Sequence, residues 1–218
     1  MAFVIGVSGQ AQMGKDTVAD YLAKKLNAKA PDKFSIWERT AFANNVKKVY
    51  QETFDRDRDF IEEWKVKAEN PPGFDMNVRK SLQFIGDGFR EIYPTIWLDL
   101  VFRNISKPTI ISDVRYVNEF LRVKKEGGLN ILVGRPEKLN DDPNGSEAQI
   151  RPYVKWCLDH YGDNDVTMIG SEPDVPPNMD KFDLFINNNK DLETLYGNID
   201  QLVLPFIEQF VFKFNIPE

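Results

Sequence analysis

A short glycine-containing segment near the N-terminus carries the residue types of a phosphate-binding loop. Residues 9–17 read Gly-Gln-Ala-Gln-Met-Gly-Lys-Asp-Thr, which fits G-x-x-x-x-G-K with the hydroxyl residue one place later than in the commonest form. Glycines let such a loop curl so that its N–H groups point at phosphate oxygens, and the dipole of the following helix adds positive potential. A lysine neutralises the β- and γ-phosphates, and a hydroxyl reaches Mg²⁺. We therefore predict an ATP-binding loop formed by Gly9, Gln10, Ala11, Gln12, Met13, Gly14, Lys15, Asp16 and Thr17.

Lys15 and the two residues after it narrow the class of protein. The spacing of Thr17 from Lys15 resembles small-molecule and nucleotide kinases more than GTPases or motor ATPases. The carboxylate of Asp16 could bind metal waters or orient the acceptor, as a catalytic group beside Lys15. The alternative for Asp16 is an acid favoured by the helix dipole alone. A dinucleotide site fits less well, because the glycines of residues 6–14 do not make G-x-G-x-x-G.

A second set of polar residues follows an apolar run at residues 108–112. Ligands of doubly wound sheets bind beyond the carboxyl ends of the strands, so we expect Asp113 and Arg115 to point toward Lys15. Asp113 could hold a Mg²⁺-bound water, and Arg115 could bind phosphate through two parallel hydrogen bonds during catalysis. The alternative is an Asp that caps the next helix, with Arg115 in a surface ion pair.

Three further arginines and one tryptophan lie near the ends of predicted elements. Phosphoryl transfer between two phosphorylated molecules brings negative charges together, which calls for guanidinium groups around them. Arg79, Arg90 and Arg135 are the candidates, although a solvated charge is the better interpretation of Arg79 by itself. Trp97 could stack on a base, and its alternative is a place in the hydrophobic core.

The residues named above lie in a sequence whose predicted strands alternate with predicted helices. This alternation predicts an α/β fold with a P-loop NTPase-type parallel sheet flanked by helices. We expect one domain over residues 1–218, with a helical substrate-cap region at about 43–105 and a lid-like insertion with loops at about 136–181. The predicted strands cover residues 3–7, 37–42, 108–112, 129–133 and 182–186. The predicted helices cover residues 17–26, 43–69, 78–92, 97–105, 118–125, 153–161 and 192–210.

The composition excludes several function classes. With 28 Lys and Arg against 34 Asp and Glu, a net charge of −6 argues against direct binding to duplex nucleic acid. A single Cys permits no intramolecular disulfide, and a single His removes Cys/His zinc sites. No signal peptide and no membrane span is expected, which predicts a cytoplasmic protein. The four C-terminal phenylalanines are candidates for core or for a homodimer face: Phe206, Phe210, Phe212 and Phe214.

Several short blocks of the sequence, which include the phosphate loop and the segment around Asp113 and Arg115, resemble the bacteriophage deoxynucleoside monophosphate kinases, a P-loop nucleotide-kinase family. The resemblance covers most of the chain, and its most specific part joins Ser112-Asp113-Val114-Arg115 and Asn118-Glu119 to the Leu82-Gln83, Gly86 and Arg90 block. The other blocks are 9–17, 40–43, 79–86, 96–97, 134–136, 146–147 and 182–188.

The family resemblance implies transfer of a phosphoryl group from ATP, with Mg²⁺, to a deoxynucleoside monophosphate for viral DNA synthesis in the host cell cytoplasm. It implies that the monophosphate side is lined by Arg79, Arg90, Trp97, Asp113, Arg115 and Glu119. It also implies that Arg135 neutralises charge during transfer, while Thr17 and Asp113 serve the metal.

Two other function classes stay open at this stage. Gly-Lys-Asp also occurs in phosphomevalonate-type kinases, so another phosphorylated small molecule is an alternative acceptor. A nucleotide-dependent switch protein without transfer activity is the second alternative, although a switch has less need of a second phosphate-binding arginine.

Overall fold

The computed structural model describes residues 2–30, 36–67, 69–141, 145–170 and 175–214. Its backbone contacts divide the chain into two compact units, each described by itself. The sheet unit comprises Met1–Thr40 and Ile105–Glu218, and the helical unit comprises Ala41–Asn104. The predicted substrate-cap region, residues 43–105, spans nearly the same residues as the helical unit, and its role as a cap stays a prediction.

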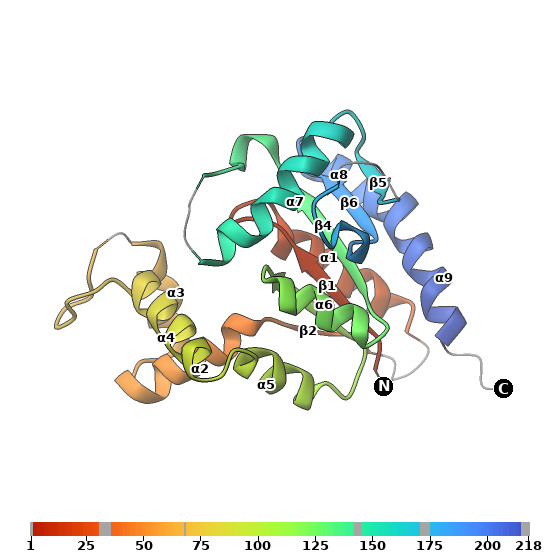
Figure 1. The fold of residues 1–218 in the computed structure, drawn as a ribbon. Helices are drawn as coiled ribbons and strands as arrows, with labels where there is room; N and C mark the ends of the chain where they lie inside the picture. The colour runs from red at the N-terminus through yellow and green to blue at the C-terminus, as the bar shows by residue number, and fades with distance from the viewer. Residues whose placement is uncertain (1, 31–35, 68, 142–144, 171–174, 215–218) are drawn as a thin grey trace. The chain divides into compact units, whose positions relative to one another are not determined.

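The sheet unit is built on one six-stranded sheet with the order β2-β3-β1-β4-β6-β5 (Figure 1). All neighbouring strands pair in parallel except β5, which runs antiparallel to β6 at the edge. The central strands are buried over their whole length because helices cover both faces, which explains their continuous Val, Ile and Leu runs. The strands are β1 (Val4–Ser8), β2 (Glu38–Thr40), β3 (Thr109–Val114), β4 (Leu129–Gly134), β5 (Val166–Met168) and β6 (Leu184–Asn187).

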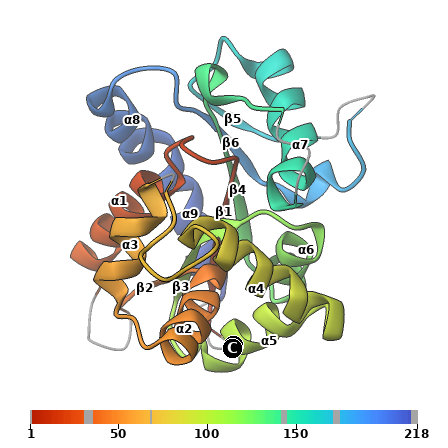
Figure 2. The same ribbon diagram turned by 90° about the vertical axis from the view of Figure 1, so that its left-hand side faces the viewer.

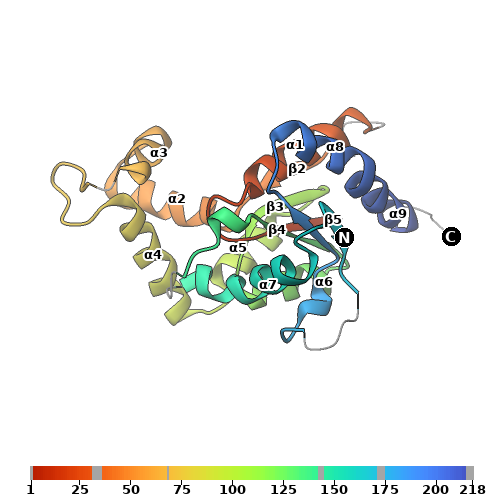
Figure 3. The ribbon, with the colours of Figure 1, turned by 90° about the horizontal axis from the view of Figure 1, so that it is seen from above.

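Helices cover both faces of this sheet. Figure 3 shows α1, α8 and α9 on one face and α6 and α7 on the other. The ring of Tyr21 in α1 stacks on that of Tyr196 in α8 with centroids 3.9 Å apart, which joins these two helices. The bounds are α1 (Lys15–Ala28), α6 (Val117–Lys125), α7 (Gly145–Tyr161), α8 (Leu192–Asn198) and α9 (Leu204–Phe214), with short helical turns at Pro136–Lys138 and Met179–Lys181 and a π-helical segment at Ile199–Val203.

The α/β fold with a mainly parallel sheet is confirmed, and residues 136–181 differ most from the prediction. Helix α7 begins at Gly145 rather than at 153, and it packs on β4 and β6 as part of the covered sheet. The strand β5 was missed because it is three residues long, half-exposed and surrounded by Asp, Asn and Gly. Much of the predicted lid-like insertion therefore belongs to the sheet unit itself.

The helical unit is a group of four helices, shown from a second side in Figure 2. Its core is formed by Tyr50, Ile61 and Val78, against which Phe74 and Leu82 pack. The single helix predicted at 43–69 is interrupted at Asp55, which adopts a left-handed backbone. The bounds are α2 (Phe42–Phe54), α3 (Arg58–Val66), α4 (Val78–Ile92) and α5 (Ile96–Asn104).

Trp97 belongs to the interior of the helical unit, so its prediction as a base-stacking residue is wrong. The residue is 1 % exposed. Its indole Nε1 donates to the carbonyl oxygen of Gly86 at 2.9 Å, and its ring lies 5.5 Å from that of Phe89. A fully buried indole whose N–H is engaged by α4 is not available to a ligand.

Trp97→Ala should therefore destabilise the protein by about 3–5 kcal/mol, because it removes a fully buried aromatic side chain. Trp97→Phe keeps much of the apolar volume and should cost less. Urea unfolding measures both. A Phe variant with normal stability but a tenfold higher KM for a nucleotide would contradict the core assignment.

Helix α9 carries the C-terminal phenylalanines that were predicted to lie in the core or at a dimer face. Phe206 and Phe210 are half-buried with ring centroids 4.9 Å apart, whereas the side chains of Phe212 and Phe214 lie outside the described part. The homodimer face stays a prediction. Among the helices that the structure describes, none combines the length and the apolar character needed to cross a bilayer.

Candidate active site

The predicted phosphate loop lies between β1 and α1, where its backbone takes an unusual course. Gly9, Gln12 and Gly14 have φ values of 146°, 61° and 93°. A Cβ on Gly14 would stand 2.3 Å from Nδ2 of Asn188, and one on Gly9 would stand 2.4 Å from a backbone oxygen of Val133. Both glycines are thus required by the backbone angle and by close neighbours, and the loop geometry follows from the motif.

Lys15 is the first residue of α1 and is 4 % exposed. Its Nζ donates to the carbonyl oxygen of Gln10 at 2.5 Å, so the side chain folds back along the loop. Burial, and secondarily the nearby guanidinium of Arg115, lower its pKa from 10.5 to about 7. The carboxylates of Glu147, Asp16 and Asp113 oppose this decrease. An anion bound in the loop would favour the charged form of Lys15 in the same way.

The predicted approach of Asp113 and Arg115 to Lys15 is confirmed. Both residues lie at the carboxyl end of β3, beside β1, and both interact electrostatically with Lys15. Arg115 is ion-paired with Glu147, a residue for which the sequence indicated no role. The loop lysine, a guanidinium and three carboxylates therefore meet at one edge of the sheet.

Glu119 does not face this site, so its prediction as a substrate-lining residue is wrong. It is 1 % exposed. Its Oε2 accepts hydrogen bonds from the backbone N–H groups of Arg115 at 2.8 Å and Tyr116 at 3.0 Å. Glu119 thus stabilises the start of α6 and fixes the backbone that carries Arg115.

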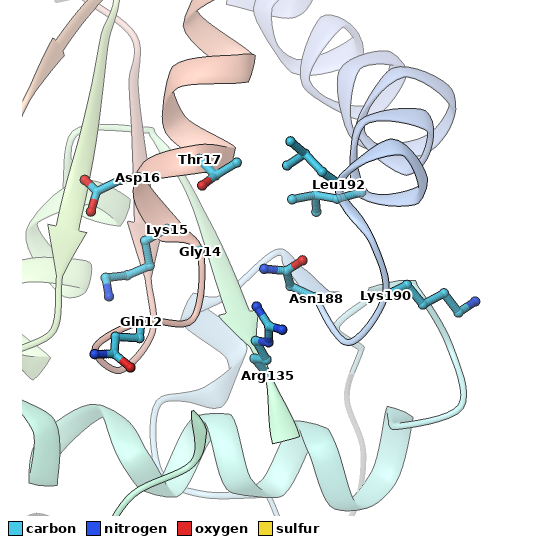
Figure 4. A pocket seen from close by; sticks show the side chains of 10 residues that line it. Gln12, Gly14, Lys15, Asp16, Thr17, Arg135, Asn188, Lys190 and Leu192 are labelled. Atoms are coloured by element: carbon cyan, nitrogen blue, oxygen red, sulfur yellow. The ribbon is translucent and has the colours of Figure 1, made fainter. Parts of the chain in front are cut away.

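A pocket of about 380 Å³ opens beside the loop (Figure 4). Arg135, directly after β4, projects its guanidinium into this space toward Asn188. Arg135 is 35 % exposed and paired with Glu137 at 3.3 Å, so it can exchange that partner for a ligand. The lining residues are Gln12, Gly14, Lys15, Asp16, Thr17, Arg135, Asn188, Lys190, Leu192 and Leu195.

Asn188 is a site residue that falls within the 182–188 block of the family resemblance, for which the sequence indicated no role. It is 8 % exposed, and its Nδ2 donates to the carbonyl oxygen of Met13 at 3.0 Å. Its own N–H donates to the carbonyl oxygen of Gly134 at 2.7 Å. Asn188 therefore holds the end of the phosphate loop, and its position just after β6 was the available signal.

Asn188→Ala should weaken ADP binding about five- to tenfold, because about 1 kcal/mol of hydrogen bonding that orients the loop is lost. Calorimetry measures the affinity. The matched control is Asn27→Ala, since Asn27 makes the same kind of bonds to the backbone of Trp37, at 2.7 and 3.1 Å, in a position away from the pocket. Equal ADP affinities in both variants would contradict the role of Asn188.

Asp16 lies on the opposite side of the loop from Arg135, and its carboxylate points away from that guanidinium (Figure 4). It is ion-paired with Arg39 at β2, and it accepts from the hydroxyl of Ser112 at 3.3 Å. Arg39 also binds Asp20 at 2.7 Å. Arg39 was not among the predicted site residues, although it falls within a predicted strand, residues 37–42, that ends at this edge of the sheet.

The side chains of Gln10 and Met13 are buried beneath the loop and do not line the pocket. Met13 is fully buried. The side chain of Gln10 is also fully buried, and its Nε2 donates to the carbonyl oxygen of Asn140 at 3.1 Å while its Oε1 accepts from the N–H of Asn140 at 3.2 Å. Gln10 therefore attaches the loop to the segment before α7.

The two remaining predicted arginines belong to the helical unit. Arg79 is exposed in the first turn of α4. Arg90 is in the last turn, with its side chain 22 % exposed and 3.2 Å from Asp87. Their contribution to an acceptor site stays a prediction.

The donor set suits Mg²⁺ held together with phosphates. Among the described residues, no group of three or more His, Cys, Asp and Glu is arranged to hold a metal alone. Mg²⁺ commonly keeps waters and phosphate oxygens and takes only one or two protein ligands. The hydroxyl of Thr17, which lines the pocket, and the carboxylate of Asp113, near Lys15, are oxygen donors of that kind.

Comparisons with known proteins found one similar viral protein and several distantly similar structures. No family model matches the sequence. A protein of Acanthamoeba polyphaga mimivirus, described as "Putative deoxynucleotide monophosphate kinase", is 26 % identical over 215 residues that cover 90 % of this chain and 93 % of the relative. Among solved structures, shikimate kinase from Bacteroides thetaiotaomicron aligns with a TM-score of 0.45 and 12 % identity, covering 94 % of this chain and 98 % of that enzyme.

The mimivirus relative is the comparison that bears on the activity, because the alignment covers 90 % of this chain. The α/β fold does not depend on any comparison, since the order of the strands in the sheet shows it directly. That relative comes from a giant virus rather than from a bacteriophage. The loop, the arginine at the end of β3 and this alignment support a P-loop kinase, and the resemblance of the chain to the deoxynucleoside monophosphate kinases is confirmed.

Proposed function

We propose that the protein transfers the γ-phosphoryl group of ATP to a deoxynucleoside monophosphate and releases ADP and a deoxynucleoside diphosphate. The observation that carries this proposal is the electrostatic contact of the buried Lys15 with Arg115 beside a glycine-rich loop at a helix N-terminus. A loop of this kind binds one phosphate chain, and a guanidinium next to its lysine can bind a second anion.

The pocket in Figure 4 fits the donor nucleotide. Its lining combines Lys15 and Thr17 of the phosphate loop and α1 with the apolar side chains of Leu192 and Leu195. A triphosphate at the loop places its sugar and base toward such apolar groups, which is the usual character of a nucleotide pocket. Arg135 then adds positive charge along the phosphate chain.

The chemistry requires alignment and charge stabilisation rather than a general base. The acceptor phosphate is already an anion, so it can attack the γ-phosphorus in line without losing a proton to the protein. Lys15 neutralises the donor phosphates, Arg115 orients the transferred group, and Arg135 stabilises charge as it develops. Bound Mg²⁺, with Thr17 and Asp113 as its protein donors, would supply further neutralisation of the phosphate oxygens.

The nucleotide acceptor is proposed from two supports. The mimivirus relative bears the name of a deoxynucleotide monophosphate kinase, and the α4 block with Arg79 and Arg90 resembles that family. Arg79 and Arg90 are proposed to bind the acceptor phosphate. A viral setting would place this reaction in the host cytoplasm, where it supplies DNA precursors.

A panel of acceptors tests the proposal. The four deoxynucleoside monophosphates and their ribonucleotide counterparts are incubated with Mg·ATP, and ADP release is coupled to an optical assay. We expect release that depends on at least one deoxynucleotide and is confirmed as diphosphate by chromatography. Transfer to an isoprenoid phosphate alone, or slow ATP hydrolysis that no monophosphate changes, would contradict the proposal and favour a different kinase or a switch protein.

A further inference from the structure

Glu147, near the start of α7, is a buried acid that joins the phosphate loop to Arg115. The residue is 5 % exposed. Its Oε2 accepts from the backbone N–H of Ala11 at 2.9 Å, and its Oε1 accepts from Nη1 of Arg115. One carboxylate thus contacts both the loop and the guanidinium that the proposed function assigns to phosphate binding.

The backbone of Glu147 is also held in place by hydrogen bonding. The side-chain amide of Gln10 donates to the carbonyl oxygen of Glu147 at 3.4 Å, and the hydroxyl of Ser146 lies 3.4 Å from Nη1 of Arg115. A buried carboxylate is costly unless it is paired and hydrogen-bonded, and here both oxygens have donors. The carboxylate therefore has little freedom to leave this position.

Among the described residues, the hydrogen bonds of the Arg115 guanidinium all involve one nitrogen, Nη1. The printed distances join Nη1 to Glu147 and Ser146, whereas Nε is buried without a hydrogen-bond partner among the described residues. An unsatisfied buried donor is costly, and guanidinium N–H groups bind phosphate oxygens well. Nε itself is closed to solvent. The side chain of Arg115 is 26 % exposed, so an anion can reach the open part of the guanidinium.

We propose that Glu147 is a positioning residue that sets the distance between the phosphate loop and Arg115, so that the guanidinium of Arg115 meets the phosphoryl group held by the loop. This inference rests on the proposed function, because it assigns Arg115 to the transferred group. Glu147 does not touch the substrate in this account and acts through Ala11 and Arg115. Correct spacing matters because a displacement of about 1 Å can cost about 100-fold in rate.

Glu147→Gln tests the inference most directly. The amide keeps the shape but has one acceptor oxygen and an NH₂ group, so it cannot accept from both Ala11 and Arg115. We expect kcat to fall about 10- to 100-fold while the KM for ATP changes less than about threefold. The double variant Arg115→Ala with Glu147→Gln is compared with Arg115→Ala alone, both at higher enzyme concentration. Its kcat should be less than about threefold lower than that of Arg115→Ala, because Glu147 acts through Arg115.

Asp183→Asn is the matched control. Asp183 also joins a backbone N–H to a cation, since its Oδ2 accepts from the N–H of Asn130 at 2.8 Å and its Oδ1 accepts from Nζ of Lys124 at 2.8 Å. Its side chain is 15 % exposed and lies outside the candidate site. This variant should lose stability, as the Glu147 variant does, without the change in kcat.

A hydrogen-exchange measurement makes the test independent of the acceptor. Hydrogen exchange of the backbone N–H of Ala11 is followed in the wild type, Glu147→Gln and Asp183→Asn. Because this N–H donates to Oε2 of Glu147 at 2.9 Å, its exchange should become at least about fivefold faster in the Glu147 variant alone.

Each outcome decides the inference. Unchanged turnover and unchanged exchange of the Ala11 N–H in Glu147→Gln would overturn it, as would a higher kcat with a lower KM for the acceptor, which would make Glu147 a competitor of the acceptor phosphate. Equal losses of kcat in the Glu147 and Asp183 variants would reduce Glu147 to a structural residue. If the wild type transfers to no nucleoside monophosphate, the proposed function fails, and the exchange of the Ala11 N–H alone supports or overturns the coupling of Glu147 to the loop.

Discussion

Lys15→Met should lower kcat at least about 1,000-fold while leaving the fold intact. Lys15 is the only described cation that is buried within the phosphate loop itself, and its charge is expected to neutralise the phosphate oxygens in the transition state, an effect worth several kcal/mol in a site that excludes water. Methionine retains the length of the apolar stem, so packing is preserved. Coupled ADP release measures kcat, and circular dichroism checks the fold.

The same substitution should stabilise the protein at neutral pH. The pKa of Lys15 is about 7 in the folded protein against an ordinary value of 10.5, so between these pH values the unfolded chain binds more protons at this position. Stability conferred through this group therefore rises as the pH increases from about 7 to 10.5, and the charged lysine is unfavourable below that window. Replacing it with methionine removes that penalty.

Urea unfolding at pH 7 and pH 9 checks this expectation. The wild type should gain stability over this interval relative to Lys15→Met, and the variant should be at least as stable as the wild type at pH 7. A variant that is both inactive and strongly destabilised at pH 7 would show that Lys15 serves the fold rather than phosphate binding.

Arg115→Ala should lower kcat about 100- to 1,000-fold and should also destabilise the protein. The loss of turnover follows from removing a two-pronged phosphate ligand. The loss of stability follows because Glu147 keeps its buried charge without its partner, and breaking a buried pair costs about 3–5 kcal/mol.

Arg115→Lys separates these two effects. Lysine can still pair with Glu147, so most of the stability should return, whereas a single ammonium cannot reproduce the planar fork of a guanidinium. We expect kcat to stay at least about tenfold below that of the wild type. Recovery of both stability and turnover in the lysine variant would contradict the role of Arg115 as a geometric phosphate ligand.

The phosphate loop and its approach to Asp113 and Arg115 could be predicted from the sequence because both rest on local rules. The glycine spacing determines the loop backbone, and parallel strands bring their carboxyl ends to one edge of a sheet. Two short apolar runs, at residues 3–7 and 108–112, were enough to place these groups together. The observed pairing of β1 with β3 is the contact that this prediction requires.

The misassigned residues depend on tertiary packing that no local pattern encodes. Trp97 and Glu119 have side chains of the kinds that bind nucleotides. The indole of Trp97, however, donates to the carbonyl oxygen of Gly86, and the carboxylate of Glu119 accepts from the backbone N–H of Arg115. Arg39 and Asn188 were overlooked for the converse reason, since each stands at the end of a strand and gains its importance only from the neighbour that the sheet order supplies. Sequence spacing locates a strand end without telling which way its side chains turn.

The hydrogen bond between Asn188 and the carbonyl of Met13 has a consequence for the order of events during folding. The first strand and the glycine loop leave the ribosome early, yet the amide that fixes the loop belongs to a segment 175 residues later. A growing chain that lacks β6 therefore carries the whole nucleotide motif without the group that gives it its working shape. Full affinity for nucleotides should therefore require that β6 has joined the sheet, so that a growing chain without this strand holds ATP more weakly.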